Sequence, residues 1–120
     1  MGSVDVLFDN PTVKTLSQFA AVIADVLEIA EFEQRESSNY IDEIYFRGRS
    51  GKIEIEAALT DDVDHEDLPY WLYLSSSEIS EAKIIEFIDL KVIDELLPLG
   101  FEAARIESFG LLNKERRINY

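Results

Sequence analysis

The segment from residue 61 to residue 67 holds the only histidine of the chain, and its side chains are the first candidates for chemistry. His65 stands among five acids, Asp61, Asp62, Asp64, Glu66 and Asp67. A histidine that acts as a general base needs a nucleophile to activate, and no serine, threonine or cysteine accompanies His65 in this segment. We therefore expect an exposed, solvated loop in which His65 has no catalytic role.

The same acids have part of the spacing of a calcium-binding loop. Asp62, Asp64 and Glu66 alternate as the first oxygen ligands of such a loop do. The position that requires a glycine for the sharp turn is Asp67, however, and the twelfth position, which requires a bidentate glutamate, is Tyr73. The pattern predicts no dedicated metal site.

Other catalytic motifs are missing from the sequence. The chain has no cysteine, so it has no thiolate nucleophile and no cysteine metal site, and its five glycines form no phosphate-binding loop. Pairs of carboxylates are unavoidable among 25 acids and indicate nothing specific. We predict that the protein is not an enzyme and needs no cofactor.

The charge balance restricts the choice of partners. With 25 Asp and Glu against 11 Lys and Arg, the net charge is −14, which disfavours nucleic acid and anionic membranes and favours a cationic partner. Solubility alone is the alternative explanation of such a charge. Two small basic groups are interpreted as solubilising turn and tail residues: Arg47, Arg49 and Lys52, and Lys114, Arg116 and Arg117.

Two amphipathic segments predict helices. Asn10-Pro11 is a favourable helix start, and the apolar spacing that follows predicts a helix over 11–30. A second stripe from Ile84 to Leu97 predicts a helix that is capped within 75–77 and ends near Pro98 and Gly100. A competing interpretation makes 83–88 a strand and leaves a helix over 89–97 only.

Four segments between the helices, and one after them, have strand character. They are the surroundings of Phe32, residues 44–46, residues 53–59 after a Ser50-Gly51 turn, residues 70–74, which we expect at the centre of the sheet, and residues 101–108. The order α-β-β-β-β-α-β predicts a single α+β domain over residues 1–120, with a mainly antiparallel sheet of about five strands and two helices packed on one face. Neither a secretory signal nor an apolar run of membrane-spanning length is present, so we expect a cytoplasmic protein.

One part of this fold combines acids with aromatic residues. Glu54 and Glu56 lie on the polar face of the 53–59 strand, the acidic segment 61–67 extends from its end, and Tyr70-Trp71 follow at once. Acids accelerate the encounter with a basic protein, and Tyr and Trp supply binding energy. We predict a protein interface at these residues; the alternative is that Trp71 belongs to the core and the acids only interact with water.

Several segments together resemble small bacterial immunity proteins of polymorphic toxin and contact-dependent growth inhibition systems. They are Asn39-Tyr40, Ile44-Tyr45-Phe46, Gly51-Lys52-Ile53-Glu54-Ile55, the acidic loop, Pro69-Tyr70-Trp71-Leu72 and Leu97-Pro98-Leu99-Gly100-Phe101. The resemblance implies a protein that binds a cognate toxin domain, in many systems a basic nuclease, and occludes its active site. An acidic adaptor, or a nucleic-acid mimic that occupies a basic groove on another protein, is the alternative function.

Overall fold

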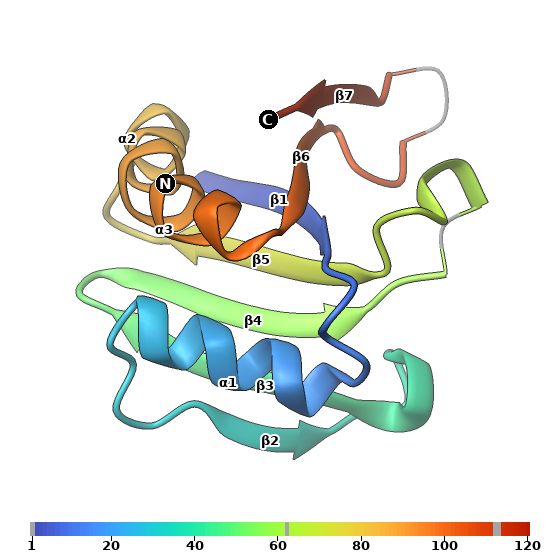
Figure 1. Ribbon diagram of the computed structural model, residues 1–120. Helices are drawn as coiled ribbons and strands as arrows, with labels where there is room; N and C mark the ends of the chain where they lie inside the picture. The colour runs from blue at the N-terminus through green and yellow to red at the C-terminus, as the bar shows by residue number, and fades with distance from the viewer. Residues whose placement is uncertain (1, 62, 112–113) are drawn as a thin grey trace.

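The computed structural model describes residues 2–61, 63–111 and 114–120, and within them it contains one antiparallel sheet of seven strands (Figure 1). The strand order is β2-β3-β4-β5-β1-β6-β7. The strands are β1 (Gly2–Asp9), β2 (Glu33–Glu36), β3 (Ile44–Ser50), β4 (Ile53–Leu59), β5 (Tyr70–Ser76), β6 (Glu102–Glu107) and β7 (Arg116–Asn119).

The helices form one layer in front of the sheet, as Figure 1 shows. The first is α1 (Leu16–Val26). The second is a continuous helical stretch made of α2 (Glu81–Phe87), a π-helical segment η3 (Ile88–Ile93), α3 (Asp94–Leu96) and a 3₁₀ turn η4 (Leu97–Leu99). Two further 3₁₀ turns are η1 (Ile41–Glu43) and η2 (Val63–His65). No helix in the described ranges is long and apolar enough to cross a membrane.

The α+β class and the single helical layer are confirmed, whereas the strand number and element order need correction. The predicted order lacks β1 and β7, so the sheet has seven strands where about five were expected. β1 pairs with β5 and β6 and is an interior strand of the sheet. Residues 83–88 are helical, so the competing strand interpretation is wrong.

The first helix is shorter than predicted because Asn10 caps a different turn. The Asn10 side chain accepts a hydrogen bond from the Thr12 amide at 2.9 Å and donates one to the Leu99 carbonyl at 3.1 Å. The helix itself is capped by Thr15, whose hydroxyl accepts a hydrogen bond from the Gln18 amide at 3.1 Å. Asn10 thereby joins the end of β1 to the end of the second helical stretch.

Phe19 of α1 lies at the centre of the core between the helices and the sheet. Its ring centroid is 5.0 Å from that of Tyr70, 5.6 Å from that of Phe8 and 6.1 Å from that of Phe101. These contacts connect α1 with β5, with β1 and with the chain that enters β6. The other sheet face carries a smaller hydrophobic cluster of Leu7, Leu68, Ala104 and Ile106, and none of the described α-helices packs on it.

Candidate interaction surface

The sheet face opposite the described α-helices, here called the open face, is defined by strand register. Trp71 of β5 is paired with Leu7 of β1 and with Ala58 of β4, so all three side chains lie on the same face. Glu56 of β4 is paired with Tyr73 of β5 on the one side and with Arg47 of β3 on the other. The open face therefore combines aromatic and charged side chains over the central strands.

Five partly exposed rings form an aromatic cluster on the open face. Trp71 is in its middle, with ring centroids at 5.4 Å to Phe109, 6.2 Å to Tyr40 and 6.3 Å to Tyr73, and Tyr40 stacks on Tyr45 at 4.5 Å. Trp71 and Tyr73 come from β5 and Tyr45 from β3, whereas Tyr40 and Phe109 come from connections. The predicted interface residue Trp71 thus belongs to a larger aromatic surface.

Tyr70, the other predicted aromatic contact, lies on the opposite face. Its side chain is 5% exposed, its ring stacks on Phe19 and its hydroxyl donates a hydrogen bond to the Val13 carbonyl at 3.2 Å. Successive residues of a strand point to opposite faces, so Tyr70 and Trp71 cannot both face a partner. Tyr70 is a core residue.

Of the two strand acids predicted for the interface, Glu56 lies closer to the aromatic cluster. Burial, together with the charge of Glu56 and a hydrogen bond to it, raises the pKa of the Tyr40 hydroxyl. Glu54 is bound instead by Arg47, with 3.0 Å between Arg47 Nη2 and Glu54 Oε2. No ion pair to the Glu56 carboxylate is found within the described part of the chain, although its cross-strand neighbour Arg47 lies close enough for the two charges to interact.

Asp5 is a functional candidate that the sequence analysis missed. It is a partly buried residue of β1, and its Oδ1 accepts a hydrogen bond from Trp71 Nε1 at 2.8 Å. Burial raises the pKa of Asp5 to about 6, although the indole hydrogen bond acts in the opposite direction. A hollow of about 560 Å³ lies beside it, lined by Ser3, Asp5, Tyr40, Glu56, Trp71, Tyr73, Phe109 and Gly110.

The acidic segment 61–67 is only in part the exposed loop that was predicted. Asp61, Asp64, Glu66 and Asp67 are exposed, and Asp62 lies outside the described residues. His65, by contrast, is 5% exposed, so the prediction of a solvated histidine is wrong. The ring of His65 lies 6.4 Å from that of Phe109, which brings the segment next to the aromatic cluster.

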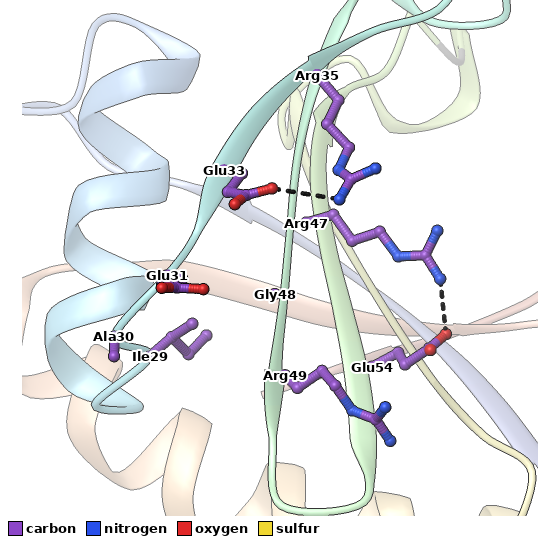
Figure 2. A pocket seen from close by; sticks show the side chains of 9 residues that line it. All are labelled: Ile29, Ala30, Glu31, Glu33, Arg35, Arg47, Gly48, Arg49 and Glu54. Carbon is purple, nitrogen blue, oxygen red and sulfur yellow. Dashed lines mark hydrogen bonds and ion pairs between the residues drawn. The ribbon is translucent and has the colours of Figure 1, made fainter.

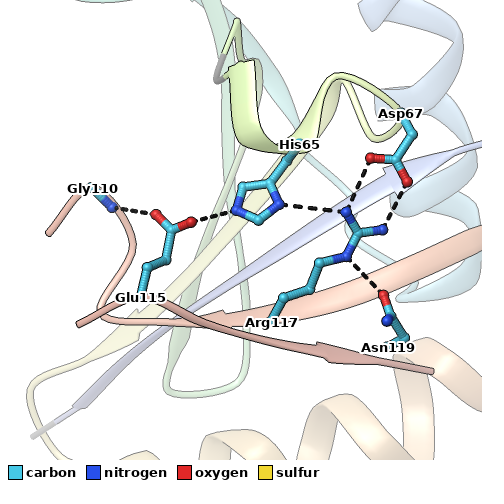
Figure 3. Close-up of polar contacts among 6 residues, drawn as sticks. All are labelled: His65, Asp67, Gly110, Glu115, Arg117 and Asn119. Carbon is cyan, nitrogen blue, oxygen red and sulfur yellow. Dashed lines mark hydrogen bonds and ion pairs between the residues drawn. The ribbon is translucent and has the colours of Figure 1, made fainter. Parts of the chain in front are cut away.

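Four side chains, called the His65 clasp here, explain this burial: His65, Asp67, Glu115 and Arg117 (Figure 3). One ring nitrogen of His65 contacts the Glu115 carboxylate, and the other lies 3.4 Å from Arg117 Nη1. Arg117 binds both carboxylate oxygens of Asp67, at 3.0 and 2.7 Å, and this hydrogen bonding lowers the pKa of Asp67. The clasp ties the β4–β5 connection to β7, and both nitrogens of His65 are engaged in it.

Breaking the clasp should destabilise the fold. We expect Arg117→Ala to lower the free energy of unfolding by about 1–2 kcal/mol, because it removes a bidentate, partly exposed ion pair and a contact of His65. Arg116→Ala is the matched control: Arg116 is exposed and outside the clasp, so its loss should cost no more than about 0.5 kcal/mol. Urea unfolding of both variants measures the difference, and equal losses would contradict a structural role of the clasp.

A second hollow, of about 550 Å³, lies at the β2–β3 edge of the sheet (Figure 2). Its lining contains three arginines, Arg35, Arg47 and Arg49, and three glutamates, Glu31, Glu33 and Glu54. Arg35 is paired with Glu33 at 3.2 Å, and Arg47 with Glu54. Since the charges of these six side chains balance, the lining favours neither an anion nor a cation.

Among the described residues, no group of three or more His, Asp or Glu side chains is placed to hold a metal ion. Comparisons of the chain with protein-family models, with curated proteins and with solved structures gave no match. The geometry of the open face is therefore the basis for any functional assignment.

Proposed function

We propose that this chain is a protein-binding domain that neutralises a cognate, basic toxin domain by covering its active site with the open face. The observation that carries the proposal is the aromatic cluster around Trp71, which is partly exposed on the sheet face opposite the described α-helices, in a protein with a net charge of −14. Partly exposed Trp and Tyr side chains are the residues that most often supply the binding energy of protein interfaces.

The exposed acids of the 61–67 segment are expected to accelerate association with the toxin. An antidote must capture a toxin before the toxin acts, which requires fast association, and opposite charges accelerate the encounter of two proteins. Asp61, Asp64 and Glu66 are exposed in the segment whose His65 ring lies 6.4 Å from Phe109 of the cluster, and Asp62 is expected to act with them. Asp67 contributes less, because Arg117 already binds its carboxylate.

The toxin assignment is tested first with the gene directly upstream, because the gene of an antidote of this kind should follow the gene that encodes its toxin. The C-terminal domain of that gene product should form a one-to-one complex with this chain in size-exclusion chromatography and lose its toxic activity in the complex. An upstream product that neither binds nor is inhibited would overturn the assignment. An adaptor for a housekeeping protein would have no such neighbour.

The role of Asp61, Asp64 and Glu66 in accelerating association is tested by the association rate of the same complex. At low salt the triple variant Asp61→Asn, Asp64→Asn, Glu66→Gln should associate about tenfold more slowly, while its dissociation rate changes little. The control triple, Asp25→Asn, Asp94→Asn, Glu95→Gln, removes the same charge from exposed helix positions and should slow association much less. Equal slowing in stopped-flow measurements would mean that only net charge matters and would remove the loop from the interface.

A further inference from the structure

The hollow beside Trp71 differs from the rest of the open face in the chemistry of its lining. Four of its eight lining residues are aromatic, two are acids, and none is a lysine, arginine or histidine. The hollow of Figure 2, in contrast, contains as many arginines as glutamates. The Trp71 hollow is therefore complementary to a positive charge.

The rings around Trp71 also present their faces in several directions. Tyr73 is inclined at 61° and Phe109 at 68° to the indole plane, so these three rings do not stack into a flat stripe. The face of an aromatic ring attracts a cation, most strongly when the cation has lost its water. Rings at steep angles beside carboxylates are a suitable environment for a cationic group that enters from above the sheet.

We propose that this hollow receives the guanidinium group of an arginine side chain from the basic partner, stacked on the aromatic rings and bound by the Glu56 carboxylate. The inference rests on the proposed function and names its central contact. A guanidinium fits better than an ammonium because it is planar, stacks on rings and is more weakly hydrated. Arginine is one of the residue types enriched at interface hot spots, which cluster in well-packed, desolvated pockets.

Asp5 supports this assignment independently of Glu56. Asp5 lines the hollow and accepts the hydrogen bond of the Trp71 indole N–H, and an asparagine would serve that need. A carboxylate that is partly buried without a cation is unfavourable, whereas a guanidinium in the hollow would compensate its charge. The negative charge of Asp5 is thus explained by a ligand rather than by the fold.

The experiment uses the full chain and a short peptide. Because Trp71 is the only tryptophan, its fluorescence and its single indole N–H signal in NMR spectra report on the hollow directly. Acetyl-Gly-Arg-Gly-amide should change the Trp71 fluorescence and the indole N–H signal, and these changes should saturate at millimolar peptide concentrations. The lysine peptide should bind about threefold more weakly and the norleucine peptide at least about tenfold more weakly. Equal responses to arginine and norleucine would overturn the proposal.

Two variants of neighbouring acids on β4 locate the site. Glu56→Gln keeps a hydrogen-bonding group near Tyr40 but removes the charge. It should weaken the binding of the arginine peptide about tenfold. Glu54→Gln is the control, because it removes the same charge two residues away on the same face and should change affinity less than about twofold. Equal weakening would mean general attraction to an acidic protein and would overturn the site.

The toxin experiment and the peptide experiment can succeed or fail independently of each other. Saturable peptide binding that depends on Glu56 supports the hollow even if the upstream gene product proves not to be a partner. Conversely, a neutralised toxin whose affinity is unchanged by Glu56→Gln, with no peptide binding, would leave the proposed function standing and overturn the arginine contact.

Discussion

Phe19→Ala is expected to lower the free energy of unfolding by about 3–5 kcal/mol, because the Phe19 ring is completely buried and touches three other rings. Those rings come from β1 (Phe8), from β5 (Tyr70) and from the residue before β6 (Phe101). The cavity left by alanine would lie between α1 and the central strands, where the strands on either side restrict collapse. For a domain of this size the loss is a large fraction of the total stability.

Phe87→Ala is the control for the Phe19 substitution. Phe87 lies on the second helical stretch and is only partly buried against the same core, so removal of its ring should cost about 1–2 kcal/mol. Urea unfolding followed by circular dichroism gives both values. If the two variants lost equal stability, Phe19 would not be the centre of the core.

Periodicity was sufficient to predict the elements that have one buried and one exposed side. The stripe of α1, the alternation of β4 and the stripe of the second helix all have this form. β4 was placed at its observed bounds, whereas the predicted first helix was five residues too long at its start and four at its end, and the second helix is capped by Ser80 and not within 75–77. β1 was missed: it alternates only over the short run from Ser3 to Val6, and it is buried on both faces from Val6 to Phe8. β7 was missed for the opposite reason: its sequence is polar, and it becomes a strand by pairing with β6.

The candidate site was predictable only where it lies on a recognised strand. Glu56 and Trp71 were identified from β4 and β5, but Tyr70 was assigned to the same surface although strand alternation excludes this. Asp5 could not be proposed while β1 was missing. The burial of His65 depends on Glu115 and Arg117, which are 50 and 52 residues away in the sequence, and no local pattern contains such contacts.

Asp5→Asn is expected to stabilise the protein at pH 7 by about 2 kcal/mol. The folded-state pKa of Asp5 is about 6, against an ordinary value of 3.8, because burial disfavours its charged form. This difference corresponds to about 3 kcal/mol, and partial contact with water reduces the expected effect. Asparagine retains an oxygen that accepts the Trp71 indole N–H, so the substitution removes the charge and keeps the hydrogen bond.

The pH dependence of the stability distinguishes the charge of Asp5 from other effects of the substitution. Between pH 3.8 and about 6 the folded state binds more protons at Asp5 than the unfolded state does, so the Asp5 contribution to stability falls as the pH rises. Asp67, whose pKa is lowered mainly by its hydrogen bond with Arg117, contributes in the opposite direction and loses its contribution as the pH falls. The difference between variant and wild type cancels Asp67 and should grow from near zero at pH 4 to its full value at pH 7.

Urea unfolding at pH 4 and pH 7 measures that difference, and the same gain at both pH values would contradict a charge effect at Asp5. The substitution also connects stability to the proposed contact. If the Asp5 carboxylate serves an arginine ligand, the more stable variant should bind the arginine peptide several-fold more weakly at pH 7, since it has lost one of the two acids of the hollow. A gain in stability together with a loss of binding is the combination expected of a residue that is kept for a partner at the expense of the fold.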